Sequence, residues 1–216
     1  MLSKHNLRII LYLCWLGVLV ACATNANKPV RFGDGGLISS EPCGPPCFWS
    51  ITLGMVYEDA IVALDSVPGV DSSFCKEVSN NEIISFQCKG LMVSATNEDP
   101  THREVILIRF EMQETVTVAE VLAKHGVPDY ASIGSNLDPH FPVINMSLLY
   151  NEYSAYFGLE SQDALETDYL YELHSETSVK SVQYLTDEVY SEAASLSGVE
   201  WIGYGLYESQ PLNFEE

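Results

Sequence analysis

Positive charge is scarce in this sequence. It contains 10 Lys and Arg residues against 30 Asp and Glu residues, which gives a formal net charge of −20 at pH 7. A surface of this sign repels nucleic-acid phosphates and anionic lipid head groups. The charge balance therefore excludes a nucleic-acid-binding protein and is compatible with basic partners.

The common motifs of catalytic and metal sites are also missing. The chain has no H-E-x-x-H zinc motif and no G-x-S-x-G nucleophile motif. Gly33-Asp34-Gly35-Gly36 lacks the Lys, the preceding strand and the following helix of a phosphate-binding loop. No spaced metal pair is formed by the histidines that follow residue 21, which are His102, His125, His140 and His174. We expect no catalytic residue, no metal site and no cofactor.

A long apolar run is missing as well, since the longest one near the N-terminus, Ile9–Val20, has 12 residues. A helix needs about 20 residues to cross a bilayer. A basic head at Lys4 and Arg8 followed by a short apolar run is typical of a secretory signal peptide. We therefore predict that residues 1–21 are a signal peptide and that the chain is exported.

The residues that follow this run, Leu19-Val20-Ala21-Cys22, resemble the lipobox of bacterial lipoproteins. The resemblance implies cleavage before Cys22, a diacylglyceryl group on its thiol and an acyl chain such as palmitate on the new amino terminus. Two or more acyl chains anchor a protein stably in a membrane. The expected location is therefore the extracytoplasmic face of a cell membrane, with membrane lipid as a partner. Ordinary signal cleavage at the same place is the alternative.

After loss of the signal peptide and lipidation of Cys22, four cysteines remain: Cys43, Cys47, Cys75 and Cys88. An even number in an exported chain predicts two disulfides, with three possible pairings. A turn centred on Asn81-Glu82 places residue 75 opposite residue 88, where the Cβ atoms are close enough for a bridge. We therefore expect Cys75–Cys88, with Cys43–Cys47 as the second pair.

Two other interpretations of these cysteines are weaker. Cys43-Gly-Pro-Pro-Cys47 has three intervening residues where a thioredoxin-like redox motif has two, and the next expected helix begins only near residue 56. A four-cysteine zinc site would need converging thiolates, with which oxidation competes outside the cytoplasm. The structural disulfide is the prediction that fits the position of the motif.

The order of expected elements predicts an α+β fold. Apolar residues recur at helical spacing over 56–64 and 118–122, and strand-like runs follow each helix. We expect a lipidated Cys22 and flexible tether over 22–42, one helix-then-antiparallel-strand unit over 43–113, and a second over 114–210 with an acidic, tyrosine-rich insertion. The two units can share one continuous sheet with helices on one face.

The short helices that end in Val67-Pro68-Gly69 and Gly126-Val127-Pro128 resemble those of small outer-membrane-assembly lipoproteins. The paired arrangement is similar to tandem β-lactamase-inhibitor-like folds, and the Pro-Pro-Cys box after the tether resembles bacterial surface lipoproteins of unknown activity. These resemblances imply an envelope assembly factor or an inhibitor as a further function.

Tyrosine is concentrated near the C-terminus, where nine of the 12 tyrosines lie between Tyr150 and Tyr207 among many acids. Aromatic residues favour strands, so core positions are one interpretation. The other is an exposed surface that binds a basic protein, a cationic peptide or a cell-wall glycan. Its candidate residues are Tyr150, Tyr153, Tyr156, Tyr169 and Tyr171.

These observations together predict a membrane-anchored, extracytoplasmic lipoprotein that acts as a non-enzymatic binding or interaction module. A secreted hydrolase is the main alternative, because the many Asp and Glu residues can hide a pair of catalytic carboxylates.

Overall fold

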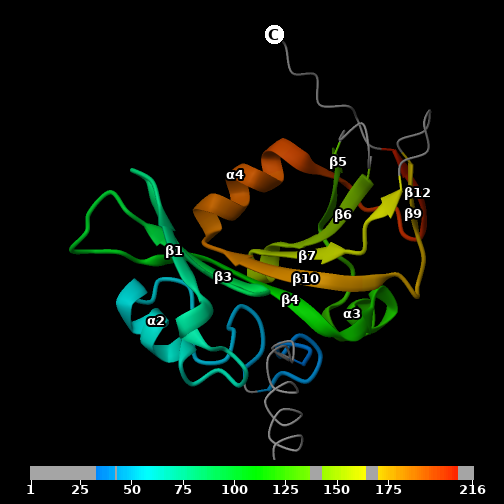
Figure 1. The fold of residues 1–216 in the computed structure, drawn as a ribbon. Helices are drawn as coiled ribbons and strands as arrows, with labels where there is room; N and C mark the ends of the chain where they lie inside the picture. Colours follow the sequence, from blue (N-terminus) through cyan, green and yellow to red (C-terminus); the bar gives the residue numbers. More distant parts are fainter. Residues whose placement is uncertain (1–32, 42, 137–142, 164–169, 209–216) are drawn as a thin grey trace, which may run out of the picture. The chain divides into compact units, whose positions relative to one another are not determined.

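The protein is described by a computed structural model that covers residues 33–41, 43–136, 143–163 and 170–208. Antiparallel β-sheet dominates these ranges (Figure 1). The helices are α2 (Tyr57–Leu64), α3 (Val118–His125) and α4 (Asp187–Ser197). Two short 3-10 turns, η1 (Ser72–Phe74) and η2 (Asn151–Tyr153), precede β1 and β7.

The main sheet has ten strands, nine of them in the order β1-β2-β3-β4-β10-β7-β6-β5-β11, with β8 paired to β6. Their bounds are β1 Lys76–Ser79, β2 Ile83–Cys88, β3 Leu91–Thr96, β4 Val105–Thr117, β5 Tyr130–Asn136, β6 Val143–Tyr150, β7 Ala155–Leu159, β8 Gln162–Asp163, β10 Ser178–Leu185 and β11 Gly198–Glu200. A separate ribbon pairs β9 (Leu170–Leu173) with β12 (Gly205–Glu208). The expected boundary at residue 113 falls inside β4, so the sheet is continuous across it.

The alternation of apolar and polar residues in β4 gives the sheet two different faces. Ile108 and Phe110 are buried, whereas Arg109 and Glu111 are exposed. Successive side chains of a strand point to opposite faces, so each pair marks one face. The face that carries Ile108 and Phe110 is called the core face below, and the one that carries Arg109 is called the polar face.

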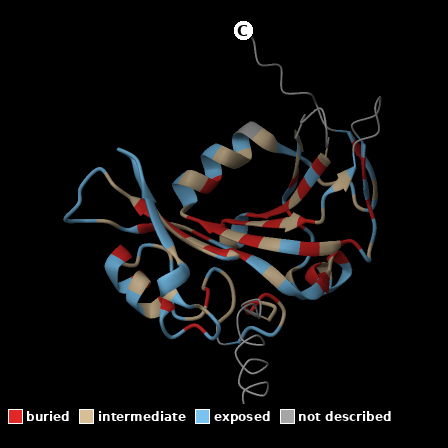
Figure 2. Cartoon of the chain, in the orientation of Figure 1, coloured by how far each residue is buried: buried red, intermediate tan, exposed pale blue. Residues whose placement is uncertain are grey.

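Two helices and the N-terminal segment pack on the core face. In α2, Tyr57 packs against Ile84 of β2 and Ala95 of β3. Phe48 stacks on Phe110 of β4, with ring centroids 4.4 Å apart. Figure 2 shows that the buried residues gather in the central strands, while the β1 end is largely exposed.

A capping box begins α3. The backbone N–H of Glu120 donates to the Thr117 hydroxyl, and the Glu120 carboxylate accepts a hydrogen bond from the Thr117 backbone N–H. This reciprocal pairing satisfies two of the free donors at the start of a helix. Gly126 ends α3 with a positive φ of 80°.

The third helix, α4, corrects the expectation that helices cover one face only. It packs on the polar face, where Tyr190 forms a buried cluster with Leu149 of β6 and Leu185 of β10. Figure 1 shows α4 on the other side of the sheet from α2. Leu149 and Leu185 lie on the polar face by register although their side chains are apolar, and α4 covers them.

Residues 33–41 were expected to form part of a flexible tether, and the structure corrects this expectation. The Asp34 carboxylate accepts hydrogen bonds from the backbone N–H groups of Gly36, Ile38 and Ser39 at 3.0, 2.9 and 2.6 Å. Burial opposes ionisation of this carboxyl, but these hydrogen bonds outweigh it and lower the pKa of Asp34. Leu37 is fully buried. The folded domain therefore begins before Cys43, and residues 22–32 lie outside the described ranges.

Both disulfides expected from the sequence are present. Cys75–Cys88 links the entry to β1 with the end of β2, and the β1–β2 register pairs Lys76 with Gln87, as a turn centred on Asn81-Glu82 predicts. Closing a loop of this size contributes about 3 kcal/mol in the chain-entropy model. Cys43–Cys47 closes a shorter loop just before the buried Phe48.

Replacing Leu37→Ala tests whether the 33–41 segment belongs to the core. Loss of a fully buried leucine side chain is expected to lower the free energy of unfolding by about 2–5 kcal/mol, measured by urea denaturation. The matched control is Leu206→Ala, where the leucine is 57% exposed and the change should stay within about 0.5 kcal/mol. Equal effects of the two substitutions would contradict the packing described here.

Candidate functional site

A row of polar side chains crosses the part of the polar face that α4 leaves open. The strand register places Lys76 opposite Gln87, Gln87 opposite Met92, Met92 opposite Arg109, and Arg109 opposite Gln183. Neighbouring strands lie about 4.8 Å apart, so this row of five side chains is about 19 Å long. It runs perpendicular to the strands, on the side of the sheet away from α2 and α3.

The next row towards the Glu111 end of β4 consists of small residues. Glu111 pairs with Ser181, Ser181 with Gly158, and Gly158 with Ser147. A Cβ atom on Gly158 would lie 2.5 Å from the Ser181 Oγ. A side chain at this position would require the Ser181 hydroxyl to move, and with glycine there the row forms the floor of a groove.

The groove has a volume of about 470 Å³. Arg109, Gln183 and Tyr156 line one side, and Asn145, Ser161 and Lys180 are among the residues that line it elsewhere. A smaller hollow of about 270 Å³, lined in part by Gln87 and Met92, shares Arg109 and Glu111 with it. Pockets of a few hundred Å³ are the usual size of small-ligand sites.

Arg109 is the central charge of the groove. Its side chain is exposed, and it forms no ion pair or side-chain hydrogen bond with any described residue. A guanidinium has five N–H donors in a rigid plane that matches a carboxylate or a phosphate. Arg109 can therefore present its donors to a ligand without first breaking an internal contact.

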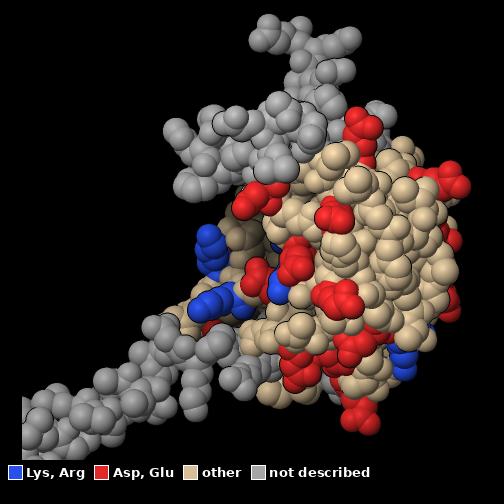
Figure 3. Space-filling view, turned by 90° about the vertical axis from the view of Figure 1, so that its right-hand side faces the viewer, with Lys and Arg blue, Asp and Glu red and all other residues tan. Residues whose placement is uncertain are grey.

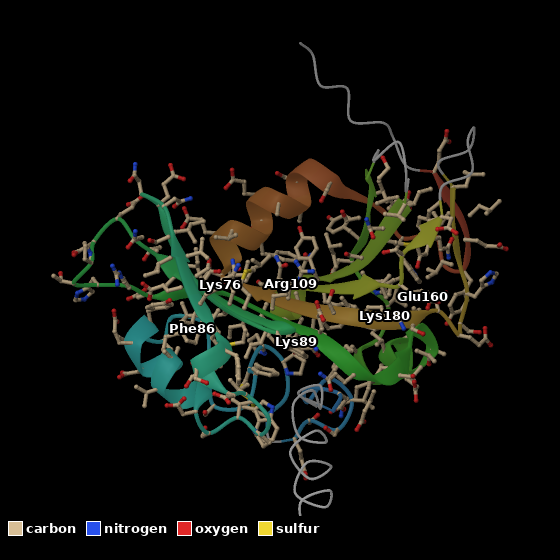
Figure 4. The ribbon with its side chains drawn as sticks, in the orientation of Figure 1. Lys76, Phe86, Lys89, Arg109, Glu160 and Lys180 are labelled. Carbon is tan, nitrogen blue, oxygen red and sulfur yellow. A yellow bond between two sulfur atoms is a disulfide. The ribbon has the colours of Figure 1, made fainter. Side chains whose placement is uncertain are left out.

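A break in strand register directs Lys180 into the groove. The pairing of β10 with both β4 and β7 shifts between Val179 and Ser181, so Lys180 lies in a bulge. Bulges change the direction of a side chain and are frequent next to functional sites. The Lys180 Nζ lies 3.9 Å from Glu160 Oε2, and Figure 4 shows these two side chains side by side at one end of the groove.

The few cations of the chain are distributed unevenly. The described ranges contain Lys76, Lys89, Arg103, Arg109, Lys124 and Lys180. Arg109 and Lys180 line the groove, and Lys76 lies in the row that continues from Arg109. Figure 3 shows most of the visible Lys and Arg side chains gathered around a hollow at the left, together with some Asp and Glu side chains, whereas the charged groups elsewhere on this face are mostly acidic. The groove is therefore a local exception to a negative surface.

Tyr156 marks the end of the open part of the polar face. Its ring lines the groove and also contacts the ring of Tyr190 in α4, with centroids 5.5 Å apart. Burial raises the pKa of the Tyr156 phenol, so the group stays protonated at neutral pH. The hydroxyl oxygen itself is buried and has no hydrogen-bond partner among the described residues, so Tyr156 closes this end of the groove with a neutral side chain.

Of the five tyrosines considered for an exposed binding surface, two lie in the core. Tyr150 and Tyr171 are buried, and their hydroxyls donate to the backbone carbonyls of Gly126 and Glu160 at 3.0 and 2.7 Å. Burial raises the pKa of both phenols. The interpretation as strand and core residues is correct for these two. Among the other candidates, Tyr153 and Tyr156 are half-buried, and Tyr169 lies outside the described ranges.

The other candidate residues lie either outside the described ranges or away from the groove. Cys22 and His140 lie outside the described ranges, as does the signal peptide. His102 is exposed in a turn, where its backbone N–H donates to the Asp99 carbonyl, and His174 lies 3.5 Å from the exposed Glu172. The structure does not bring these histidines together with the groove.

Over the part of the chain that the structure describes, no group of three or more His, Cys, Asp and Glu side chains is placed to hold a metal ion. No helix within the same ranges is long and apolar enough to cross a membrane.

Comparison of this chain with protein-family models, with curated proteins and with solved structures gives no match. The site is therefore defined by its own geometry.

Sequence reasoning missed the groove. Its central residues Arg109 and Ser181 are 72 positions apart and become neighbours only because β4 pairs with β10. One signal was present in the β4 sequence, where Arg109 and Glu111 alternate with Ile108 and Phe110. That alternation shows that one face of this strand is polar, but it does not identify the neighbouring strand.

A second cluster lies on the core face, around His125 at the end of α3. The His125 Nε2 atom is 2.6 Å from the Leu37 carbonyl oxygen, and the ring meets Tyr150, Tyr153 and Phe157 edge-on. Burial lowers the pKa of His125, the hydrogen bond to Leu37 opposes this, and the charges of Lys124 and Glu152 act in opposite directions. The net direction is downward. The neutral imidazole therefore holds the N-terminal segment against α3.

This cluster predicts a pH dependence of stability. Because the folded state lowers the pKa of His125 below the ordinary histidine value of about 6.5, the unfolded chain binds more protons in this range. The histidine contribution is complete above about pH 6.5 and is lost as the pH falls through the folded-state pKa. Urea denaturation at several pH values between 5 and 7.5 should show that the unfolding free energy changes less with pH in His125→Gln than in the wild type. A slope that is unchanged or steeper in the variant would contradict this assignment.

Proposed function

We propose that this chain is a non-enzymatic binding module, anchored through a lipidated Cys22 on the extracytoplasmic face of a cell membrane. The binding surface is the groove on the polar face. The observation that carries this proposal is Arg109, an exposed guanidinium that has no partner among the described residues and lies in the row between Met92 and Gln183. A cation that stabilises no contact within the described fold is available to an external ligand.

The alternative of a secreted hydrolase has less support at this site. Glycoside hydrolysis usually needs two carboxyl groups that flank the scissile bond. Glu111 is the one carboxylate among the described residues that line the groove. The groove offers hydroxyl, amide and guanidinium groups instead, a set suited to recognition by hydrogen bonding.

We also infer that the sheet is built from two helix-then-strand units. The first consists of α2 with β1, β2, β3 and β4, and the second consists of α3 with β5, β6, β7 and β10. The sheet order supports this division, since the strands of the second unit follow one another in the reverse direction. In this arrangement the last strands of the two units, β4 and β10, pair with each other. The groove then lies at the junction of the units, on the face opposite their two helices.

The membrane anchor is tested by the mass of the mature N-terminus. Expression of the full chain in a bacterial host should give a peptide that begins at Cys22 and carries a diacylglyceryl group. Cys22→Ser should remove the lipid and release the protein from the membrane fraction. An unmodified Cys22 in the wild-type protein would contradict the anchor.

The binding surface is tested by hydrogen exchange of the full chain with and without a soluble extract of the bacterial envelope. We expect protection of the backbone around β4, β10 and β7 in the wild type. Ser181→Trp fills the groove and should abolish this protection, whereas Ser66→Trp, an exposed position after α2, should retain it.

Two results would contradict the proposed surface. One is protection that is confined to another part of the fold, such as the β9–β12 ribbon. The other is protection of the groove strands that persists unchanged in Ser181→Trp.

A further inference from the structure

The chemistry of the groove identifies a class of ligand, and this inference rests on the proposed function above. The floor is made of Ser147, Gly158 and Ser181, which lie side by side on β6, β7 and β10. Because Gly158 has no side chain and its two neighbours are serines, the floor is low and carries hydroxyl groups. It runs across three strands, a distance of about 10 Å between the outer two.

Donors and acceptors both line this floor. Arg109 offers N–H donors only, Gln183 and Asn145 offer amide groups of both kinds, and the Glu111 carboxylate accepts. The Asn145 Oδ1 already accepts a hydrogen bond of 2.6 Å from the Ser161 hydroxyl, which fixes the orientation of its amide. A ligand rich in hydroxyl groups can pair with such a mixed set, because a hydroxyl both donates and accepts.

The charge of the groove favours a ligand that also carries a carboxylate. Arg109 forms no ion pair with any described residue, and a guanidinium can bind a carboxylate through two parallel hydrogen bonds. Lys180 lies at the same groove but is already close to Glu160, so Arg109 is the stronger anchor for an anion. Lys76 extends the positive row beyond Met92.

A peptide fits this surface less well. Peptides that add a strand use the unpaired edge of a sheet, whereas the groove strands β4, β10 and β7 are paired on both sides. Protein partners are usually held by aromatic and aliphatic anchors in apolar pockets. Tyr156 is the one aromatic residue among the described side chains that line the groove.

We propose that the groove binds an acidic oligosaccharide, with a sugar carboxylate on Arg109 and sugar hydroxyls over Ser147, Ser181 and Gln183. An extended chain of two or three sugar units has the length of the groove floor. The negative charge of the surrounding surface disfavours highly charged polyanions, whereas the unpaired Arg109 compensates one carboxylate directly.

The test is a titration of the full chain, solubilised in a neutral detergent, with an acidic trimer that contains one glucuronic acid and two glucose units, and with a neutral trimer of glucose. Calorimetry should show binding of the acidic trimer, and binding of the neutral trimer that is at least about 10-fold weaker. Arg109→Gln should weaken the binding of the acidic trimer by about 10-fold or more. Lys124→Gln removes the same charge from an exposed position on α3 and is the matched control, which should leave the affinity unchanged.

Several outcomes would overturn this inference. Equal binding of both trimers would remove the role of the carboxylate, and an unchanged affinity in Arg109→Gln would place the sugar elsewhere. Tighter binding of a tri-glutamate peptide would assign the groove to acidic peptides. If the acidic trimer does not bind but envelope extract still protects β4 and β10, the saccharide inference fails while the proposed binding surface stands.

Discussion

The pairing of β4 with β10 is the constraint on which the two faces of this protein depend. It is the contact that joins β1–β4 to β5–β7 in one sheet, and it brings together residues about 70 positions apart. On the core face it sets Phe110 beside Val182, over which Phe48 and the N-terminal segment pack. On the polar face the same register sets Arg109 beside Gln183. A change of one residue in this register would exchange the two faces, so the core and the groove are specified together.

Different parts of the chain cover the two faces, and the part that covers the polar face is too short to cover all of it. The core face is covered by α2, α3 and the segment that starts with Asp34, whose anchor points are Leu37, Phe48 and His125. On the polar face, α4 is the helix that packs against the sheet within the described ranges. An eleven-residue helix is about 16 Å long, which is less than the width of a ten-stranded sheet. The open remainder must therefore carry side chains that water or a ligand can satisfy.

The features that could be predicted from the sequence are those that depend on near neighbours. The helices over 56–64 and 118–122, the β1–β2 hairpin and its disulfide follow from local periodicity, turn residues and spacing. The packing of residues 33–41 was missed because a Gly-rich segment shows no periodicity, although Leu37 is buried. The side of the sheet taken by α4 and the burial of Tyr150 and Tyr171 depend on the long-range pairing of strands. The groove was missed for the same reason, since its walls come from four strands.

The position of Arg109 in an acidic chain also sets how the groove can select its ligand. At physiological ionic strength, charges more than about 8 Å away are largely screened, so the distant acids act weakly on a bound anion. A carboxylate in contact with Arg109 lies within this distance of the guanidinium, and its attraction persists. A polyanion would extend beyond the groove over the surrounding Asp and Glu residues and meet repulsion there. Under the proposed assignment, the surrounding acidity would act as a filter: it would exclude highly charged polymers, while Arg109 would retain ligands with few, correctly placed carboxylates.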